Sequence, residues 1–215
     1  MIKAVLFDLD GVLVSTDEYH YRSWKKLSAE EGFYFFDHEF NHKFRGVARM
    51  ECVEIITKAS GRNYTPQQKQ ELADRKNRYF VESLSSVTTE VLLPGALSAL
   101  HELRNRGIKT AVASNSRNAE AIIKQVKIEH LLDAVVDGYQ IENSKPDPEV
   151  FLLAATKIDV PPPHCLVVED AIAGIESARR AGMKALGIGT KARLPNADIV
   201  VPNLAAISID DLLKL

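Results

Sequence analysis

Short runs of almost continuous apolar residues recur along the chain, and the intervals between them have the periodicity of helices. The apolar runs cover residues 4–7, 109–113, 134–136, 165–168 and 185–188, with residues 199–201 as a sixth. A strand that is covered on both faces is apolar throughout, whereas a strand with one wet face alternates apolar and polar residues. Such strands in alternation with helices are typical of a doubly wound α/β fold. The sequence therefore predicts a Rossmann-like core built on a parallel sheet.

The helical patterns of this core start and stop at residues that favour helix ends. They begin at Pro94-Gly95 and end near 106, begin at Asn118 and end near 126, begin at Asp147-Pro148, and begin at Asp170 and end near 181. Glycine favours the position just past a helix C-terminus, and Gly107 and Gly182 stand at two of these ends. The first five predicted strands are thus linked to one another by helices.

The segment between residues 15 and 85 has helical signals and no convincing buried strand. Helices are predicted over residues 18–31, 49–59 and 65–84, the last opened by a capping-box pattern at Thr65 and Gln68. A chain of 215 residues, 46% of them hydrophobic, is long enough for a core with a smaller appendage. We expect an all-helical cap domain at residues 15–85, inserted into an α/β catalytic core of residues 1–14 and 86–215.

Charge and cysteine content narrow the class of partner. The net charge is −2 and the basic residues are scattered, so nothing favours binding to nucleic acid or to an anionic membrane. No apolar stretch has the length of a membrane span, and Asp8 and Asp10 follow the first apolar run too closely for a signal peptide. The two cysteines stand far apart and suggest no disulfide framework. We expect a cytoplasmic monomer that acts on a small molecule.

Asp8 and Asp10 carry the strongest chemical signal. They stand two residues apart where the first predicted strand ends, and Gly11 allows a sharp turn after them. Residues two apart in extended chain point the same way, so the two carboxylates converge on one small volume. Such a pair is costly unless a cation lies nearby or one carboxylate is protonated. An isolated pair of this kind is more often just an acidic turn, so further residues must decide.

Three further segments stand at the ends of later strands or beside them. Ser114, Asn115 and Ser116 follow the run 109–113, where a hydroxyl group and backbone N–H groups suit a phosphate oxygen. Lys145 stands between a serine and a proline ahead of a predicted helix, where its charge can be held in a fixed place. Glu169 and Asp170 end the run 165–168. Taken singly, these segments also fit an N-cap residue, a solvated lysine and an acidic helix start. Together they line the sheet edge where α/β proteins bind ligands.

In this order the four segments resemble the four motifs of the haloacid dehalogenase superfamily of phosphoryl-transfer enzymes, and the resemblance covers essentially the whole chain. It implies that Asp8 is a nucleophile that forms an aspartyl phosphate and that Asp10 is the general acid and base. Ser114 and Lys145 would bind the transferring phosphate. The resemblance also implies a Mg²⁺ site at Asp8, the backbone carbonyl of Asp10, and Asp170, with Glu169 as a ligand or a support. The helical insertion resembles the type 1 cap of this superfamily.

Segments of the insertion resemble the β-phosphoglucomutase family more specifically. They are residues 8–12, Thr16, 18–20 and Trp24, then 44–49, 75–77, and in the core 114–118 and 143–146. The resemblance implies that β-D-glucose 1-phosphate and glucose 6-phosphate interconvert through glucose 1,6-bisphosphate. An aspartate at position 10 suits this chemistry because a sugar leaving group needs a proton.

The same resemblance assigns roles within the insertion and beside Ser114. Arg49 would bind the phosphate that is not transferred, since a guanidinium binds phosphate oxygens bidentately. His20 and Thr16 would align Asp10, and Lys76 would contact sugar or phosphate. The remaining substrate contacts implied are Leu9, Trp24, Arg45, Gly46, Val47, Asn115, Ser116, Arg117 and Asn118. Without the resemblance, His20 fits a surface histidine, Trp24 a core residue, and Arg45, Arg49 and Lys76 solvated charges.

Two other functions fit parts of this pattern. A sugar-phosphate phosphatase has the same core residues but needs no grip on a second phosphate, so Arg49, Lys76 and His20 favour the mutase. A non-catalytic sugar-phosphate sensor on this fold is expected to have lost Asp8, Asp10 or Lys145, and all three are present. The sequence therefore favours a mutase, with the phosphatase as the alternative.

Overall fold

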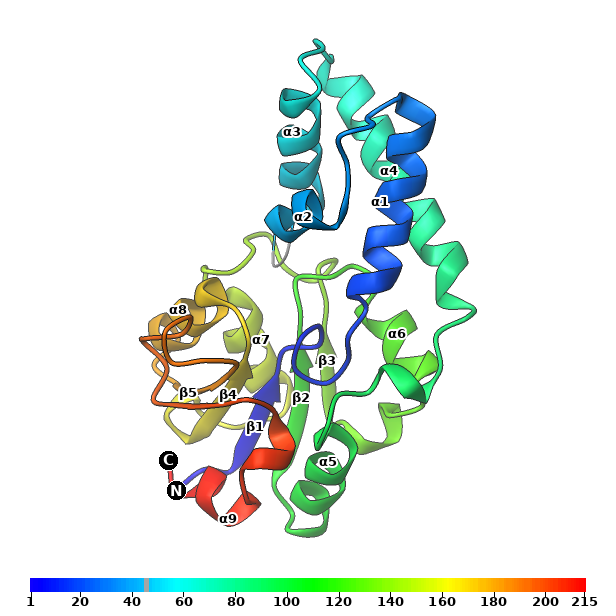
Figure 1. Ribbon diagram of the computed structural model, residues 1–215. Coiled ribbons are helices and arrows are strands. Elements are labelled where there is room, and N and C mark those ends of the chain that lie inside the picture. The colour runs from blue at the N-terminus through cyan, green and yellow to red at the C-terminus, as the bar shows by residue number, and fades with distance from the viewer. Residues whose placement is uncertain (45–46) are drawn as a thin grey trace. The chain divides into compact units, whose positions relative to one another are not determined.

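The computed structural model describes residues 1–44 and 47–215, and these residues form two compact units. One unit comprises residues 1–15 and 87–215, and the other comprises residues 16–86 (Figure 1). The sequence analysis placed the two divisions after residue 14 and after residue 85. That the second unit serves as a cap stays a prediction.

The first unit is built on a six-stranded parallel sheet in the order β3-β2-β1-β4-β5-β6. The strands are β1 (Ala4–Phe7), β2 (Lys109–Ala113), β3 (Ala134–Val136), β4 (Cys165–Glu169), β5 (Lys184–Ile188) and β6 (Ile199–Val201). The chain builds the sheet outward from β1 to β3 and then crosses to the other side of β1 for β4. The predicted doubly wound α/β core is confirmed, and the change of direction lies between β1 and β4, where such sheets bind ligands.

Helices cover both faces of this sheet, with α7 and α8 on one side and α5 and α6 on the other (Figure 1). The helices of this unit are α5 (Ala96–Asn105), α6 (Ala119–Gln125), α7 (Glu149–Lys157), α8 (Ile172–Arg180) and α9 (Ile209–Leu213). Short 3₁₀ turns are η2 (Thr89–Val91), η3 (Glu129–Leu131), η4 (Pro162–His164) and η5 (Leu204–Ala206).

The strands are apolar on both faces because each face meets a helical layer. Ala4 and Leu6 of β1 belong to a buried cluster with Phe151 of α7 and Ile175 of α8. Residues that alternate with them in the strand point to the opposite face, and Val5 is also fully buried. Burial on both faces explains why these strands are almost continuously apolar.

The second unit is helical. Its elements are α1 (Asp17–Glu31), α2 (His38–Asn41), η1 (His42–Phe44), α3 (Arg49–Ala59) and α4 (Pro66–Leu84). The predicted capping box opens α4, with Thr65 and Gln68 each bonded to the other's backbone. Asp37 accepts a hydrogen bond from the Phe40 backbone at the start of α2. The sequence analysis did not predict α2 or η1, because one helical turn is too short to show a periodicity.

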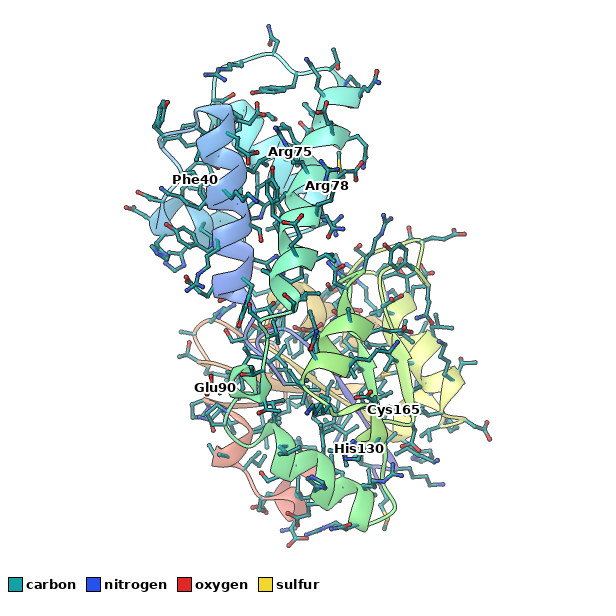
Figure 2. The ribbon with its side chains drawn as sticks, turned by 90° about the vertical axis from the view of Figure 1, so that its right-hand side faces the viewer. Phe40, Arg75, Arg78, Glu90, His130 and Cys165 are labelled. Atoms are coloured by element: carbon teal, nitrogen blue, oxygen red, sulfur yellow. The ribbon has the colours of Figure 1, made fainter. Side chains whose placement is uncertain are left out.

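The helices of this unit surround an aromatic core and are joined by an ion cluster. The core contains Trp24, Phe36, Phe44, Val53 and Leu72, among others. Arg75 of α4, labelled in Figure 2, pairs with Glu30 and Glu31 at the end of α1. Glu30 also accepts a hydrogen bond of 2.6 Å from Tyr79. Arg75 therefore ties α4 to α1 rather than presenting its charge to a ligand.

No helix within residues 1–44 and 47–215 combines the length and the apolar character that a membrane span requires.

Candidate active site

The strand register aligns the ends of β1, β2 and β4. Phe7 lies opposite Val112 on one side and Val168 on the other. The residues that follow these positions therefore emerge at one edge of the sheet. They include Asp8, Ser114 and Glu169. This edge holds the four predicted motifs of the core.

Lys145 reaches this edge from the loop before α7 and contacts three acceptors. Its Nζ donates to Asp8 Oδ1 at 2.5 Å, to Glu169 Oε2 at 2.9 Å and to the Ala113 carbonyl at 3.0 Å. The Lys145 side chain is only 6% exposed. Burial alone would lower the pKa of Lys145, but the Asp8 and Glu169 carboxylates raise it above its ordinary value. The ammonium group therefore stays charged in a fixed place.

Glu169 is the last residue of β4, and its carboxylate is buried and fully engaged. Oε2 faces Lys145, while Oε1 accepts hydrogen bonds from the backbone N–H groups of Asp170 and Ala171 at 2.9 and 3.0 Å. A Cβ atom added to Gly174 of α8 would lie 1.8 Å from Glu169 Oε2. Glycine at 174 thus leaves the space that this carboxylate fills.

Asp8, Glu169 and Asp170 each place a carboxylate oxygen within 4.8 Å of the other two. Burial raises the pKa of Asp8 well above its ordinary value, with Glu169 and Asp10 adding to the rise and Lys145 opposing it. Burial and Glu169 raise the pKa of Asp170 to about 6. Burial, the largest cause of both shifts, and the neighbouring carboxylates disfavour the ionised forms, which a bound cation would stabilise. Hard oxygen ligands suit Mg²⁺, so the residues fit the implied metal.

The segment after β2 is folded into a series of tight turns. Ser114 is buried, and its hydroxyl accepts from the Ser116 N–H at 3.1 Å. The Ser116 hydroxyl in turn accepts from the Asn118 N–H at 3.2 Å, and Asn118 is the N-cap residue of α6. The Asn115 side chain accepts from the Lys145 N–H at 3.3 Å. The predicted phosphate-binding segment is therefore tied directly to the loop that carries Lys145.

Arg117 lies outside this series and stacks on a tyrosine. Its guanidinium carbon is 5.3 Å from the centre of the Tyr139 ring, and Tyr139 itself is 70% exposed. Gly138, next to the tyrosine, approaches the Asn115 carbonyl so closely that a Cβ would lie 2.3 Å from that oxygen. Tyr139 thus limits where the charge of Arg117 can lie.

Within the helical unit, His20 of α1 and Lys76 of α4 are in contact. Lys76 Nζ lies 2.6 Å from His20 Nδ1, and the His20 ring stacks on Phe80 with centroids 4.0 Å apart. Burial lowers the pKa of His20 well below its ordinary value, and the charges of Lys76 and Arg49 lower it further. A neutral His20 can accept a hydrogen bond from Lys76 at Nδ1 and keep its own proton on Nε2.

The other predicted contacts lie in varied environments. Thr16 is 1% exposed and precedes α1 as its N-cap residue. Trp24 is buried edge-on against Phe44, so its role as a sugar contact stays a prediction that its burial does not favour. The Leu9 side chain is fully buried, and Val47 is half-buried and packs on the aromatic core. Arg45 and Gly46 lie outside the described residues.

Two residues at this edge escaped the sequence analysis. Gly174 interrupts a helical pattern, which costs stability and could have marked a close approach. Arg193, in the loop after β5, lies 3.5 Å from Asp170. No spacing or motif points to Arg193, because its contact depends on how that loop folds.

The geometry suits transfer of a phosphoryl group to a carboxylate. Asp8 offers an oxygen nucleophile, and Lys145 provides a fixed positive charge beside it. A phosphate dianion is repelled by a carboxylate, so a positive charge at this point lowers the barrier to attack.

Comparison with known proteins agrees with this chemistry. Residues 2–182 match the model of the haloacid dehalogenase-like hydrolase family. The chain is 41% identical to β-phosphoglucomutase of Bacillus subtilis over 97% of this chain and 93% of that protein. It is 30% identical to a phosphorylated carbohydrates phosphatase of Thermotoga maritima, over 85% of this chain and 83% of that protein.

A solved structure agrees with the fold along its whole length. The crystal structure of β-phosphoglucomutase from Clostridium difficile superposes with a TM-score of 0.90 at 33% identity, and covers 100% of this chain and 96% of that one. The chain therefore belongs to the haloacid dehalogenase-like hydrolase family of enzymes and, within it, to the β-phosphoglucomutase family.

Proposed function

We propose that this chain is a β-phosphoglucomutase, which interconverts β-D-glucose 1-phosphate and glucose 6-phosphate. The observation that carries the chemistry is the contact of buried Lys145 with both Asp8 and Glu169, at 2.5 and 2.9 Å. The choice of a mutase is supported by the 41% identity to the Bacillus subtilis enzyme over nearly the whole chain. In this proposal the enzyme is a cytoplasmic monomer whose partners are small sugar phosphates.

The cycle starts from an enzyme that carries a phosphoryl group on Asp8. Asp10 removes the proton of the 6-hydroxyl of β-D-glucose 1-phosphate, and that oxygen attacks the phosphorus. The bond between phosphorus and the Asp8 oxygen breaks, which releases the Asp8 carboxylate and forms glucose 1,6-bisphosphate. Lys145 stabilises the carboxylate as it forms, because its ammonium group already contacts Asp8.

The second half runs the same chemistry on the other phosphate of the bisphosphate. The sugar binds in the opposite orientation, and the Asp8 carboxylate attacks the phosphorus at position 1. The bond from that phosphorus to the sugar oxygen breaks, and Asp10 returns its proton to the oxygen. Glucose 6-phosphate leaves, and Asp8 again carries the phosphoryl group. Asp10 alternates between base and acid, so the two protonation states must both be accessible near neutral pH.

Asp8, the Asp10 backbone carbonyl and Asp170 would hold Mg²⁺, which when bound offsets the charge of the phosphoryl oxygens and of Asp8. Glu169 supports this site rather than completing it, because both of its oxygens already accept hydrogen bonds from protein groups. Its engaged carboxylate orients Lys145 and the start of the α8 segment.

In the helical unit, Arg49 binds the phosphate that is not transferred in this proposal, and Ser116, Arg117 and Asn118 of the core assist. Lys76 contacts the sugar or its phosphate, while His20 and Thr16 align Asp10. A neutral His20 suits this role, because its Nε2–H is a donor that remains available while Nδ1 faces Lys76.

The alternative is a phosphatase that hydrolyses sugar phosphates. It is favoured by the 30% identity to the carbohydrate phosphatase of Thermotoga maritima, whose chain matches this one over much of its length. The two functions share the attack by Asp8 and differ in whether water or a sugar hydroxyl receives the phosphoryl group.

A coupled assay separates them. Purified protein with Mg²⁺ and β-D-glucose 1-phosphate, primed with a trace of glucose 1,6-bisphosphate, is followed for glucose 6-phosphate and inorganic phosphate in parallel. The proposal requires glucose 6-phosphate to form without matching release of phosphate. Arg49→Ala should weaken this reaction far more than hydrolysis of a small phosphate ester. Phosphate release as the main product would establish the phosphatase instead.

A further inference from the structure

Arg193 faces the proposed metal site from a segment of its own. Its Nη2 lies 3.5 Å from Asp170 Oδ2, with the Arg193 side chain 48% exposed and that of Asp170 24% exposed. The backbone at Arg193 is anchored, because its N–H donates to the Thr190 carbonyl at 3.0 Å and the next residue, Leu194, is buried in the core. The backbone at Arg193 is thus held near the sheet edge, while about half of its side-chain surface is open to solvent.

Asp170 is confined on its other side. A Cβ added to Gly11 would lie 2.5 Å from the Asp170 carboxyl carbon, so this carboxylate packs directly on the turn after β1. The positive φ of Gly11, +85°, belongs to that turn. The Asp170 carboxylate therefore lies between Gly11 and Arg193, and its remaining direction of contact is toward Asp8 and Glu169.

Lys145 and Arg193 pair with different carboxylates of the site and are buried to different extents. Lys145 contacts Asp8 and Glu169 and is almost fully buried. Its departure would leave two buried carboxylates without a counter-ion, which is costly. Arg193 contacts Asp170 at the surface, where an ion pair is weak and easily exchanged. Two cations next to one carboxylate repel each other. A divalent ion at Asp170 would therefore oppose Arg193 and leave Lys145 in place.

We propose that Arg193 is an exchangeable counter-ion, which holds Asp170 in place in the metal-free enzyme and is displaced when a divalent cation binds. This inference rests on the proposed function, because it takes Asp170 as a metal ligand. It makes Arg193 a positioning residue that also reduces metal affinity. An exposed ion pair of this strength corresponds to a change of about two- to fivefold in the dissociation constant.

The test is calorimetric titration of Mg²⁺ into the metal-free, full-length protein. Arg193→Ala should bind Mg²⁺ about two- to fivefold more tightly than the wild type, and the difference should shrink at high ionic strength. Lys191→Ala is the matched control, because it removes one positive charge from the same loop. Lys191 donates to the Ala197 carbonyl at 2.8 Å, whereas Arg193 pairs with Asp170. Arg193→Lys should restore most of the wild-type affinity.

A thermal unfolding series provides a second readout on the same proteins. Arg193→Ala should lower the unfolding temperature of the metal-free protein and show a larger rise on addition of Mg²⁺ than the wild type or Lys191→Ala. Equal Mg²⁺ affinity in Arg193→Ala and Lys191→Ala would overturn the role of Arg193 while leaving the metal site intact. Failure of the wild type itself to bind Mg²⁺ would instead overturn the metal site of the proposed function.

Discussion

Each unit of the molecule buries a lysine, and the two ammonium groups have opposite surroundings. Lys145 of the α/β unit lies between the carboxylates of Asp8 and Glu169, both of which accept hydrogen bonds from it. Lys76 of the helical unit, 3% exposed, lies against the neutral ring of His20. Two carboxylates surround the charge of Lys145, whereas the charge of Lys76 adds to the larger effect of burial in lowering the pKa of His20.

The two buried lysine side chains are stabilised by different kinds of neighbour. Trp24 and Phe80 present their rings to Lys76, with centroids 5.3 and 4.8 Å from Nζ, so aromatic faces share in stabilising its charge. Lys145 is instead stabilised by the carboxylates of Asp8 and Glu169. Lys145 thus belongs to the cluster proposed to transfer the phosphoryl group, whereas Lys76 belongs to the residues proposed to contact the sugar phosphate.

The largest expected effect comes from removing the nucleophile beside Lys145. Asp8→Asn keeps the size of the side chain but cannot form an aspartyl phosphate, so turnover should fall by about a thousandfold or more. Lys145 keeps Glu169 as a partner, so the fold should survive. The measurement is the coupled assay, with circular dichroism as the control for folding. Ordinary turnover by this variant would exclude covalent catalysis by Asp8.

Lys145→Met tests the same contact from the other side. Loss of the fixed charge should lower kcat by about a hundred- to a thousandfold. In metal-free protein, the two carboxylates would lose their buried partner, which should cost about 3–5 kcal/mol in the free energy of unfolding. Mg²⁺ should recover part of this loss by supplying positive charge.

Lys76→Met is the matched substitution in the helical unit. Urea unfolding of both variants, with and without Mg²⁺, makes the comparison. If the two variants respond equally to Mg²⁺, Lys145 has no special electrostatic link to the proposed metal site, and the contrast between the two lysines fails.

Gly174→Ala should have a smaller effect, and it should destabilise the protein although this type of substitution usually stabilises a helix. Glycine to alanine within a helix ordinarily stabilises a protein by about 0.5–1 kcal/mol. Here the added methyl would lie 1.8 Å from Glu169 Oε2, so the carboxylate must move away from Lys145. We expect a loss of about 1–3 kcal/mol in the free energy of unfolding, and a roughly tenfold lower kcat from the misplaced charge.

Ala173→Gly, one residue earlier, is the control, with an ordinary loss of about 0.5–1 kcal/mol in the free energy of unfolding. A stabilised Gly174→Ala would show that the contact is not required.

The sequence reveals the fold more fully than the site. Each strand predicted from an apolar run was found in the structure, because burial on both faces leaves a signal in consecutive residues. Asp8 and Lys145 could be nominated because each stands at a strand end or a stiff turn. Gly174 left only the weak signal of a glycine inside a helical pattern, and Arg193 left none, since the importance of both comes from close approach across the fold.

The smallest expected effect is a change in titration within the helical unit. The folded-state pKa of His20 lies well below its ordinary value of 6.5, first through burial and then through the charges of Lys76 and Arg49. Lys76→Met removes one of these charges, so the pKa of His20 should rise while staying below the unfolded value, as followed by NMR of the ring.

An unfolded His20 binds protons more readily than the folded one, so the protein loses stability as the pH falls through about 6.5 and below. Each unit of this pKa difference corresponds to about 1.4 kcal/mol, and the loss should be smaller in Lys76→Met. His20→Gln should remove this part of the pH dependence altogether. An unchanged His20 pKa in Lys76→Met would mean that burial and Arg49 lower this pKa without help from Lys76. The proposed electrostatic effect of Lys76 on its neighbour would then be wrong.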